Sequence, residues 1–205
     1  MLKSLLDAVM ERRARHLMEQ VRDWLPTEGP VLDLGSGTGH LSARLERELG
    51  LDVIAADLTD MHVVGRTPVL ISDAVLPFDD RTFSAALLFF MLAYPKDPAA
   101  VLVEAARVTR GPVILVQTVY SGRLGYAWHR AREFVWTIVA FHASKVLGYV
   151  PREAKFTMQT RRFYTAKALQ QEFVAAGLRV WARRNRPVSP GRFLVLAGWN
   201  LERND

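Results

Sequence analysis

The stretch VLDLGSGTGHLSARL (31–45) constrains the fold more than any other part of the chain. It begins with four residues, 31–34, that are apolar except for one carboxylate, and it ends with leucines at helical spacing. Three glycines on alternate positions, Gly35, Gly37 and Gly39, lie between these two parts. This order predicts a strand, a tight turn and a helix, with backbone N–H groups gathered at the helix N-terminus. Such a turn suits a ligand that lies close against main-chain atoms.

Strands and helices are predicted to alternate along the chain. Short apolar runs predict strands at 31–34, 52–56, 69–72, 83–90, 112–119, 178–185 and 192–199. Apolar residues three or four positions apart predict helices at 38–49, 97–109 and 166–176. The run at 83–90 has no polar alternation, as expected of a parallel strand that is buried on both faces. The alternation predicts an α/β domain around a mainly parallel sheet with helices on both faces.

Two segments lie outside this alternation. Residues 2–25 predict an amphipathic helix that ends before Pro26, which makes 1–26 an N-terminal helical segment. Residues 120–160 are rich in aromatic and basic side chains and separate the fifth strand from the next helix. We interpret 120–160 as an inserted, partly helical lid. Because half of the 205 residues are hydrophobic, we expect a single domain over 1–205.

The composition narrows the classes of function. The chain has no cysteine, which excludes disulfides and thiolate metal sites and fits a cytoplasmic location; we expect no metal. No run approaches the roughly 18 to 20 apolar residues of a membrane-spanning helix. A net charge of +6 could attract an anionic membrane surface or an acidic substrate. Nucleic acid is not an expected partner, because no helix-turn-helix, RNA-binding sheet motif or zinc finger accompanies the charge. The oligomeric state is left open by the sequence.

The glycine spacing separates three kinds of nucleotide loop. A phosphate-binding NTPase loop needs Lys and then Ser or Thr after its last glycine, whereas this chain has His40 and Leu41. A dinucleotide loop needs a small residue three positions after its second glycine, where this chain has the bulky His40. The spacing Gly-x-Gly-x-Gly therefore requires no pyrophosphate.

Several motifs in order resemble the class I S-adenosylmethionine-dependent methyltransferases, and most closely the small-molecule branch of quinone-biosynthesis C-methyltransferases. They are VLDLGSGTG, the Asp57 that closes VIAAD, SDA with LPFDDRTF, FSAALLFFMLAYPKDPAAVLVEAARV, and RRFYTAKALQQEFVAAGLRV. The likeness covers residues 28–119 and 161–199. It implies a seven-stranded, mainly parallel Rossmann-like sheet whose last strand is antiparallel, with S-adenosylmethionine as the cofactor. It also implies methyl transfer to a small acceptor, which we expect to be apolar.

The resemblance also implies which residues contact the cofactor. The expected set is Asp33, Gly35, Ser36, Gly37, Gly39, Asp57, Leu58, Asp73, Ala74 and Phe89. Asp57 would bind the ribose hydroxyls and Asp73 the adenine amino group. The position of Asp57 also fits without the family, since a carboxylate about 20 residues past the glycine turn ends the second strand, where a ribose would lie. Asp33 lies in an apolar strand, so its charge needs partners, either loop N–H groups or a ligand ammonium; a purely structural role is the alternative.

The residues that act on the acceptor are less well defined. The catalytic residue is unknown, and the candidates are Tyr94, His129 and His142. His40 either faces the cofactor or is an ordinary exposed helix histidine. Tyr126, Trp128 and Trp136 are expected to cover an apolar acceptor, unless they are ordinary packing residues. Two other functions stay open: a non-catalytic protein that binds S-adenosylmethionine, and a nicotinamide-dependent oxidoreductase, against which His40 argues.

Overall fold

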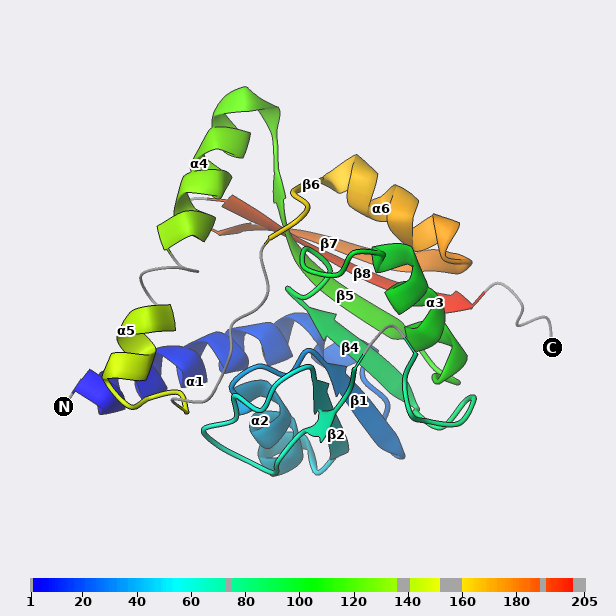
Figure 1. Ribbon diagram of the computed structural model, residues 1–205. Coiled ribbons are helices and arrows are strands. Elements are labelled where there is room, and N and C mark those ends of the chain that lie inside the picture. Colours follow the sequence, from blue (N-terminus) through cyan, green and yellow to red (C-terminus); the bar gives the residue numbers. More distant parts are fainter. Residues whose placement is uncertain (1, 73–74, 136–140, 152–159, 189–190, 201–205) are drawn as a thin grey trace.

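The computed structural model describes residues 2–72, 75–135, 141–151, 160–188 and 191–200 (Figure 1). One sheet of eight strands lies at its centre, in the order β3-β2-β1-β4-β5-β8-β7, with β6 paired to β5. The strands are β1 (Pro30–Leu34), β2 (Asp52–Asp57), β3 (Val69–Leu70), β4 (Ala85–Phe89), β5 (Val113–Tyr120), β6 (Tyr164–Thr165), β7 (Leu178–Val188) and β8 (Gly191–Asn200).

The sheet is parallel except at one strand. β1 pairs in parallel with β2 and β4, β2 with β3, and β5 with β4 and β6. β8 alone runs antiparallel to both of its neighbours, β5 and β7. The predicted fold class is therefore confirmed. The sequence pattern missed β6, because two residues carry no periodicity; β6 pairs with Val119 and Tyr120, beyond the residues of β5 that pair with β4.

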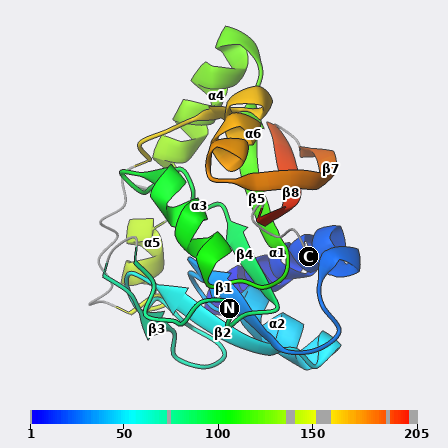
Figure 2. The same cartoon turned by 90° about the vertical axis from the view of Figure 1, so that its right-hand side faces the viewer.

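Helices cover both faces of the sheet (Figures 1 and 2). They are α1 (Leu2–Val21), which a short 3-10 turn (Arg22–Trp24) continues, α2 (His40–Leu49), α3 (Pro98–Arg107), α4 (Gly122–Phe134), α5 (Phe141–Val146) and α6 (Ala166–Ala175). Two of the starts are capped by side chains: Asp97 accepts from the N–H of Ala100 and Thr165 from the N–H of Ala168, both over 3.1 Å. Gly50, with φ +66°, caps the end of α2, and the helix therefore ends at residue 49 as predicted.

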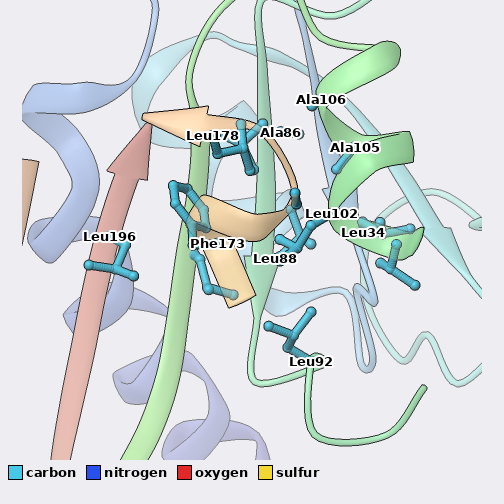
Figure 3. Close-up of a cluster of buried hydrophobic side chains, with 14 of the residues drawn as sticks. Leu34, Ala86, Leu88, Leu92, Leu102, Ala105, Ala106, Phe173, Leu178 and Leu196 are labelled. Carbon is cyan, nitrogen blue, oxygen red and sulfur yellow. The ribbon is translucent and has the colours of Figure 1, made fainter. Parts of the chain in front are cut away.

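The core consists of two apolar layers, one on each face of the sheet. On one face, Leu102 of α3 and Phe173 of α6 pack with Leu88 of β4 (Figure 3). On the other face, Leu17 of α1 and Leu45 of α2 pack against the sheet. β1 lies between β2 and β4. The chain therefore adds β2 and β3 on one side of β1, and then β4 and β5 on the other side. In such sheets the ligand crevice lies at the carboxyl ends of the strands at this switch point.

The remaining differences from the sequence prediction are local. The predicted strand 69–72 contains only the pair Val69–Leu70, and the predicted loop 187–191 is shorter because Pro187 and Val188 pair within the β7–β8 hairpin. Residues 189–190 are outside the described part of the chain. The predicted lid contains α4, which begins directly after β5, and α5, which lies beside the start of α1 (Figure 1). No helix among the described residues is both long and apolar enough to cross a membrane.

Candidate functional site

The three glycines after β1 have different structural roles. All three have positive φ, +78° at Gly35, +58° at Gly37 and +80° at Gly39, which side chains other than glycine rarely adopt. A Cβ on Gly35 would lie 2.8 Å from Cβ of Met91, and one on Gly39 would lie 2.4 Å from the carbonyl oxygen of Val64. A Cβ on Gly37 would meet no atom within 4 Å. Packing therefore requires the outer two glycines, while the middle one leaves space for a ligand.

Asp57 joins the end of β2 to this glycine turn. The N–H of Gly37 donates to its Oδ2 over 2.8 Å, and the N–H of Leu58 donates to its Oδ1 over 2.7 Å. Asp57 is only 3% exposed. Burial raises the pKa of its carboxyl, although the backbone hydrogen bonds to the carboxylate lower it in part. A carboxylate has about four acceptor positions, so Asp57 can still accept bonds from a ligand hydroxyl.

Asp33 is a second buried carboxylate at the carboxyl end of β1. Its Oδ2 accepts a hydrogen bond from the Ser42 hydroxyl over 2.6 Å, and the residue is 2% exposed. Burial raises the pKa of Asp33 to about 6; the Ser42 bond lowers it, and the nearby charge of Asp57 raises it further. A cationic group beside these two carboxylates would relieve both the burial cost and the mutual repulsion.

These groups line a cavity of about 220 Å³, which we call the turn cavity. Of the expected cofactor contacts, the lining includes Asp33, Gly35, Ser36, Gly37, Asp57 and Phe89. Gly39 and Leu58 are not among the lining residues, and Leu58 contributes only its N–H to Asp57. Asp73 and Ala74 lie outside the described residues. The sequence did not indicate that α1 also lines the cavity, through Met10, Arg13, Ala14 and Leu17.

His40 connects three separate parts of the chain beside the turn cavity. Its Nδ1 lies 2.9 Å from the Thr38 hydroxyl, and its Nε2 lies 3.0 Å from Oδ1 of Asp7 and 3.3 Å from the Tyr149 hydroxyl. The residue is 3% exposed, so it is not an exposed helix histidine. Because Asp7 is on α1 and Tyr149 follows α5, His40 holds the N-terminal helix and the end of the lid to the glycine turn.

A second cavity, of about 300 Å³, lies between β4, β5 and the lid; we call it the lid cavity. Its lining is Arg13, Phe90, Ala93, Tyr94, Gln117, Thr118, His129, Arg132, Val135, Thr160 and Arg162. Two of the catalytic candidates, Tyr94 and His129, are therefore in its wall. The third, His142, is exposed on α5 and lines neither cavity.

Three residues, Arg13, Phe90 and Tyr94, line both cavities, so the cavities adjoin. Phe90 has φ +59°, a strained value for a bulky residue, and its N–H donates to the carbonyl oxygen of Val116 over 2.7 Å. The guanidinium carbon of Arg13 lies 4.7 Å from the centre of the Phe90 ring. Strain of this kind concentrates at functional sites.

The aromatic residues of α4 were expected to cover the acceptor, but the described ones do not line the lid cavity. Neither Tyr126 nor Trp128 is in its lining. Tyr126 packs edge to face on Tyr120 and Phe163, and Trp128 is 53% exposed. Trp136 lies outside the described residues. The face of α4 towards the cavity instead presents His129 and Arg132, because residues three apart lie on one side of a helix.

The fold and the turn cavity together define a Rossmann-like domain for an adenosyl ligand. Asp57 would accept bonds from ribose hydroxyls, Gly37 leaves room for close approach, and Asp33 offers negative charge to a sulfonium or ammonium group. The chain belongs to the methyltransferase domain family, whose match covers residues 6–183. The predicted resemblance to S-adenosylmethionine-dependent methyltransferases and the predicted cofactor are thereby confirmed. Among the described residues, no group of three His, Asp or Glu side chains is placed to hold a metal.

Curated relatives with similar sequences are mainly uncharacterized. An uncharacterized protein of Mycobacterium tuberculosis is 34% identical over 160 residues, which cover 76% of this chain and 48% of that protein. An uncharacterized methyltransferase of the same organism is 38% identical over 120 residues, covering 54% of this chain and 45% of that protein. The ubiquinone/menaquinone biosynthesis C-methyltransferase of Idiomarina loihiensis is 32% identical over 104 residues, covering 42% and 41%. The chain thus spans about half the length of the curated relatives it matches.

Solved structures share the fold at low sequence identity. A geranyl diphosphate C-methyltransferase of Streptomyces coelicolor, solved with geranyl diphosphate and S-adenosyl-L-homocysteine, has a TM-score of 0.64 at 11% identity, over 95% of this chain and 80% of that one. A Haloferax volcanii methyltransferase bound to an activator protein has a TM-score of 0.63 at 17% identity, over 97% and 94%. A [4+2]-cyclase has a TM-score of 0.62 at 14% identity, over 93% and 81%. The fold alone therefore does not determine the reaction.

Proposed function

We propose that this domain transfers a methyl group from S-adenosylmethionine to a small acceptor with an apolar body, bound in the lid cavity. One observation carries the proposal: the lid cavity adjoins the turn cavity at Arg13, Phe90 and Tyr94. A methyl donor in the turn cavity and an acceptor in the lid cavity would meet there. The methyltransferases that act on quinone precursors and on geranyl diphosphate, by their names, support an apolar acceptor for this chain too.

The residues of this chain would act mainly by placing the reactants. When bound, S-adenosylmethionine supplies an electrophilic methyl carbon on a positively charged sulfur. Asp57 and the glycine turn would hold the adenosyl part, and Asp33 would stabilise positive charge nearby. Alignment of the two reactants supplies much of the acceleration in such displacements. The Tyr94 hydroxyl can accept or donate a hydrogen bond at the junction, where it would orient the acceptor atom.

Two experiments separate this function from its rivals. In a thermal-shift panel, S-adenosylmethionine or S-adenosylhomocysteine at 100 times its dissociation constant should stabilise the protein by about 2.7 kcal/mol. A response to NAD alone would support the oxidoreductase instead. Incubation with methyl-labelled S-adenosylmethionine and a metabolite extract should then yield a labelled small molecule. Cofactor binding without any labelled product would favour a non-catalytic binding protein or another reaction.

A matched pair of variants tests the place of reaction. Tyr94→Phe removes one hydroxyl from the junction of the two cavities and should lower turnover while S-adenosylhomocysteine still binds. Tyr126→Phe removes the same atom from a residue of α4 that lines neither cavity, and should leave turnover unchanged. Equal turnover in both variants would show that the acceptor atom does not contact Tyr94.

We further propose peripheral contact of the lid with an anionic membrane surface. Leu124, Trp128 and Phe134 of α4 are 88%, 53% and 62% exposed, and the exposed Arg123 lies directly before Leu124. Exposed apolar side chains together with a cationic residue are typical of helices that lie in a membrane interface. The protein should float with phosphatidylglycerol vesicles but not with phosphatidylcholine vesicles, and the double change Leu124→Gln and Trp128→Gln should abolish this. If the protein does not float with phosphatidylglycerol vesicles, the proposed membrane contact is wrong.

A further inference from the structure

The lid cavity has more arginine side chains in its wall than the turn cavity has. Its wall carries three guanidinium groups, Arg13 from α1, Arg132 from α4 and Arg162 from the segment before β6. None of the described lining residues is acidic. The charge of Arg162 is paired with Glu172 over 3.0 Å, outside the cavity lining. The two other arginines come from different elements, Arg13 from α1 and Arg132 from α4.

Arg132 differs from Arg162 in having no carboxylate partner within the described part of the chain. Its Nη2 lies 3.3 Å from Nδ1 of His129. A guanidinium can only donate, so Nδ1 of His129 must accept, and the neutral ring carries its proton on Nε2. His129 and Arg132, both in the cavity wall, therefore present hydrogen-bond donors and positive charge.

Gln117, also in the wall of the lid cavity, has a buried acceptor atom without a partner among the described residues. The residue lies on β5 near the carboxyl end of the strand and is 4% exposed, and the acceptor atom is its Oε1. A buried acceptor without a partner destabilises the fold, so such groups are normally satisfied by water or a ligand. A ligand hydroxyl in the lid cavity would satisfy it.

From this arrangement we infer that the methyl acceptor is an organic anion, an apolar molecule that carries a carboxylate or phosphate and one hydroxyl group. The inference rests on the proposed function, because it names the class of substrate for the same cavity. Arg132 and Arg13 would bind the anionic group, since guanidinium groups bind carboxylate and phosphate through paired N–H donors. The Oε1 of Gln117 would accept a hydrogen bond from the hydroxyl.

The first arm of the test measures the charge of the product. Labelled products formed from a metabolite extract are separated on an anion exchanger at pH 7, where an anionic product is retained. The variant Arg132→Gln should lower the rate of label transfer at a fixed extract concentration by about tenfold or more. Arg130→Gln, an exposed arginine of the same helix outside the cavity, should match the unchanged protein. A labelled product that is not retained, or equal rates in both variants, would overturn the inference and leave methyl transfer established.

The second arm does not depend on turnover. Binding of hexyl phosphate, hexanoate and hexanol to the protein saturated with S-adenosylhomocysteine is measured by calorimetry. Hexyl phosphate or hexanoate should bind more tightly than hexanol, and Arg132→Gln should remove the difference while Arg130→Gln keeps it. Equal binding of the three probes would refute the anion site. If no labelled product forms, the proposed methyl transfer fails, and this binding result alone decides whether the lid cavity recognises anions.

Discussion

The backbone N–H of Gly37 donates a hydrogen bond to Oδ2 of Asp57 over 2.8 Å. The carboxylate that we expect to bind the ribose therefore also fixes the glycine turn of the neighbouring strand. One side chain thus performs two tasks, because the carboxyl ends of β1 and β2 are adjacent and their residues are in parallel register. The ligand and the turn share the acceptor positions of a single buried group.

Removing this carboxylate should affect binding more than stability. Asp57→Ala should lower the affinity for S-adenosylhomocysteine at least tenfold, because charge-assisted hydrogen bonds contribute about 1.5–3 kcal/mol each. The free energy of unfolding should change little, since the burial that raises the pKa of Asp57 also makes its charge costly. Calorimetry and urea denaturation measure the two effects. Asp52→Ala, at the exposed start of the same strand, is the control and should leave affinity unchanged. Unchanged affinity in Asp57→Ala would show that the ribose binds elsewhere.

Alanine at the glycines should separate ligand binding from folding. Gly37→Ala places a Cβ in open space, so the protein should fold with a cost of about 1–2 kcal/mol from the positive φ, yet bind the cofactor poorly. Gly39→Ala adds a clash at 2.4 Å with the Val64 carbonyl and should destabilise the fold by more. Thermal unfolding and S-adenosylhomocysteine binding are compared for both variants. If Gly37→Ala binds as the unchanged protein does, no ligand approaches the main chain there.

Asp33 should make the ligand-free protein less stable as the pH rises. Its pKa is raised from 3.8 to about 6 in the fold, so the unfolded chain loses this proton first. Stability from this group is therefore full below about pH 4 and falls by about 3 kcal/mol by the time the pH passes 6. Asp33→Asn should remove the decrease and be the more stable protein at pH 7. Urea denaturation between pH 4 and 7 measures both proteins, and parallel curves would contradict the prediction.

The same carboxyl should link cofactor binding to proton release. A cation beside Asp33 favours its ionised form, so S-adenosylmethionine binding at pH 6 should release about half a proton, and little at pH 7. Calorimetry in two buffers with different ionisation enthalpies measures the number of protons released. Asp33→Asn corrects for protons released by the ligand itself and should show no such change between the two pH values. Identical proton release in the two proteins would place the positive groups of the ligand away from Asp33.

The sequence predicts those features of the fold and site that depend on one continuous segment of the chain. The apolar runs predicted every strand of the sheet except the two-residue β6, and the motifs that resemble the methyltransferases indicated the cofactor. Arg13 and Tyr149 could not be predicted in this way. In the sequence, Arg13 is one of several charges on an amphipathic helix, and Tyr149 is 109 positions away from His40, which it contacts. Such contacts depend on how helices pack on the sheet, which local periodicity does not encode.

The lid should decide the acceptor without holding the cofactor. Replacing residues 124–146 by a flexible Gly/Ser linker removes α5 and all but the first two residues of α4, and with them His129 and Arg132 from the lid cavity wall. The turn cavity keeps its lining and Tyr149 stays in place. The shortened protein should bind S-adenosylhomocysteine within a few-fold of the original affinity and transfer no labelled methyl group. Transfer at a comparable rate would show that the acceptor does not bind under α4.

A longer deletion provides the matched comparison. Removing 124–150 also deletes Tyr149 and Val150, which are buried against Leu6 and Met10 of α1. His40 would then lose its contact with the Tyr149 hydroxyl, and α1 would lose apolar contacts beside the turn cavity, which Met10 helps to line. Cofactor affinity should therefore fall in the longer deletion but not in the shorter one. Equal affinity in both would mean that α1 covers the turn cavity without help from the end of the lid, and that His40 does not couple the two.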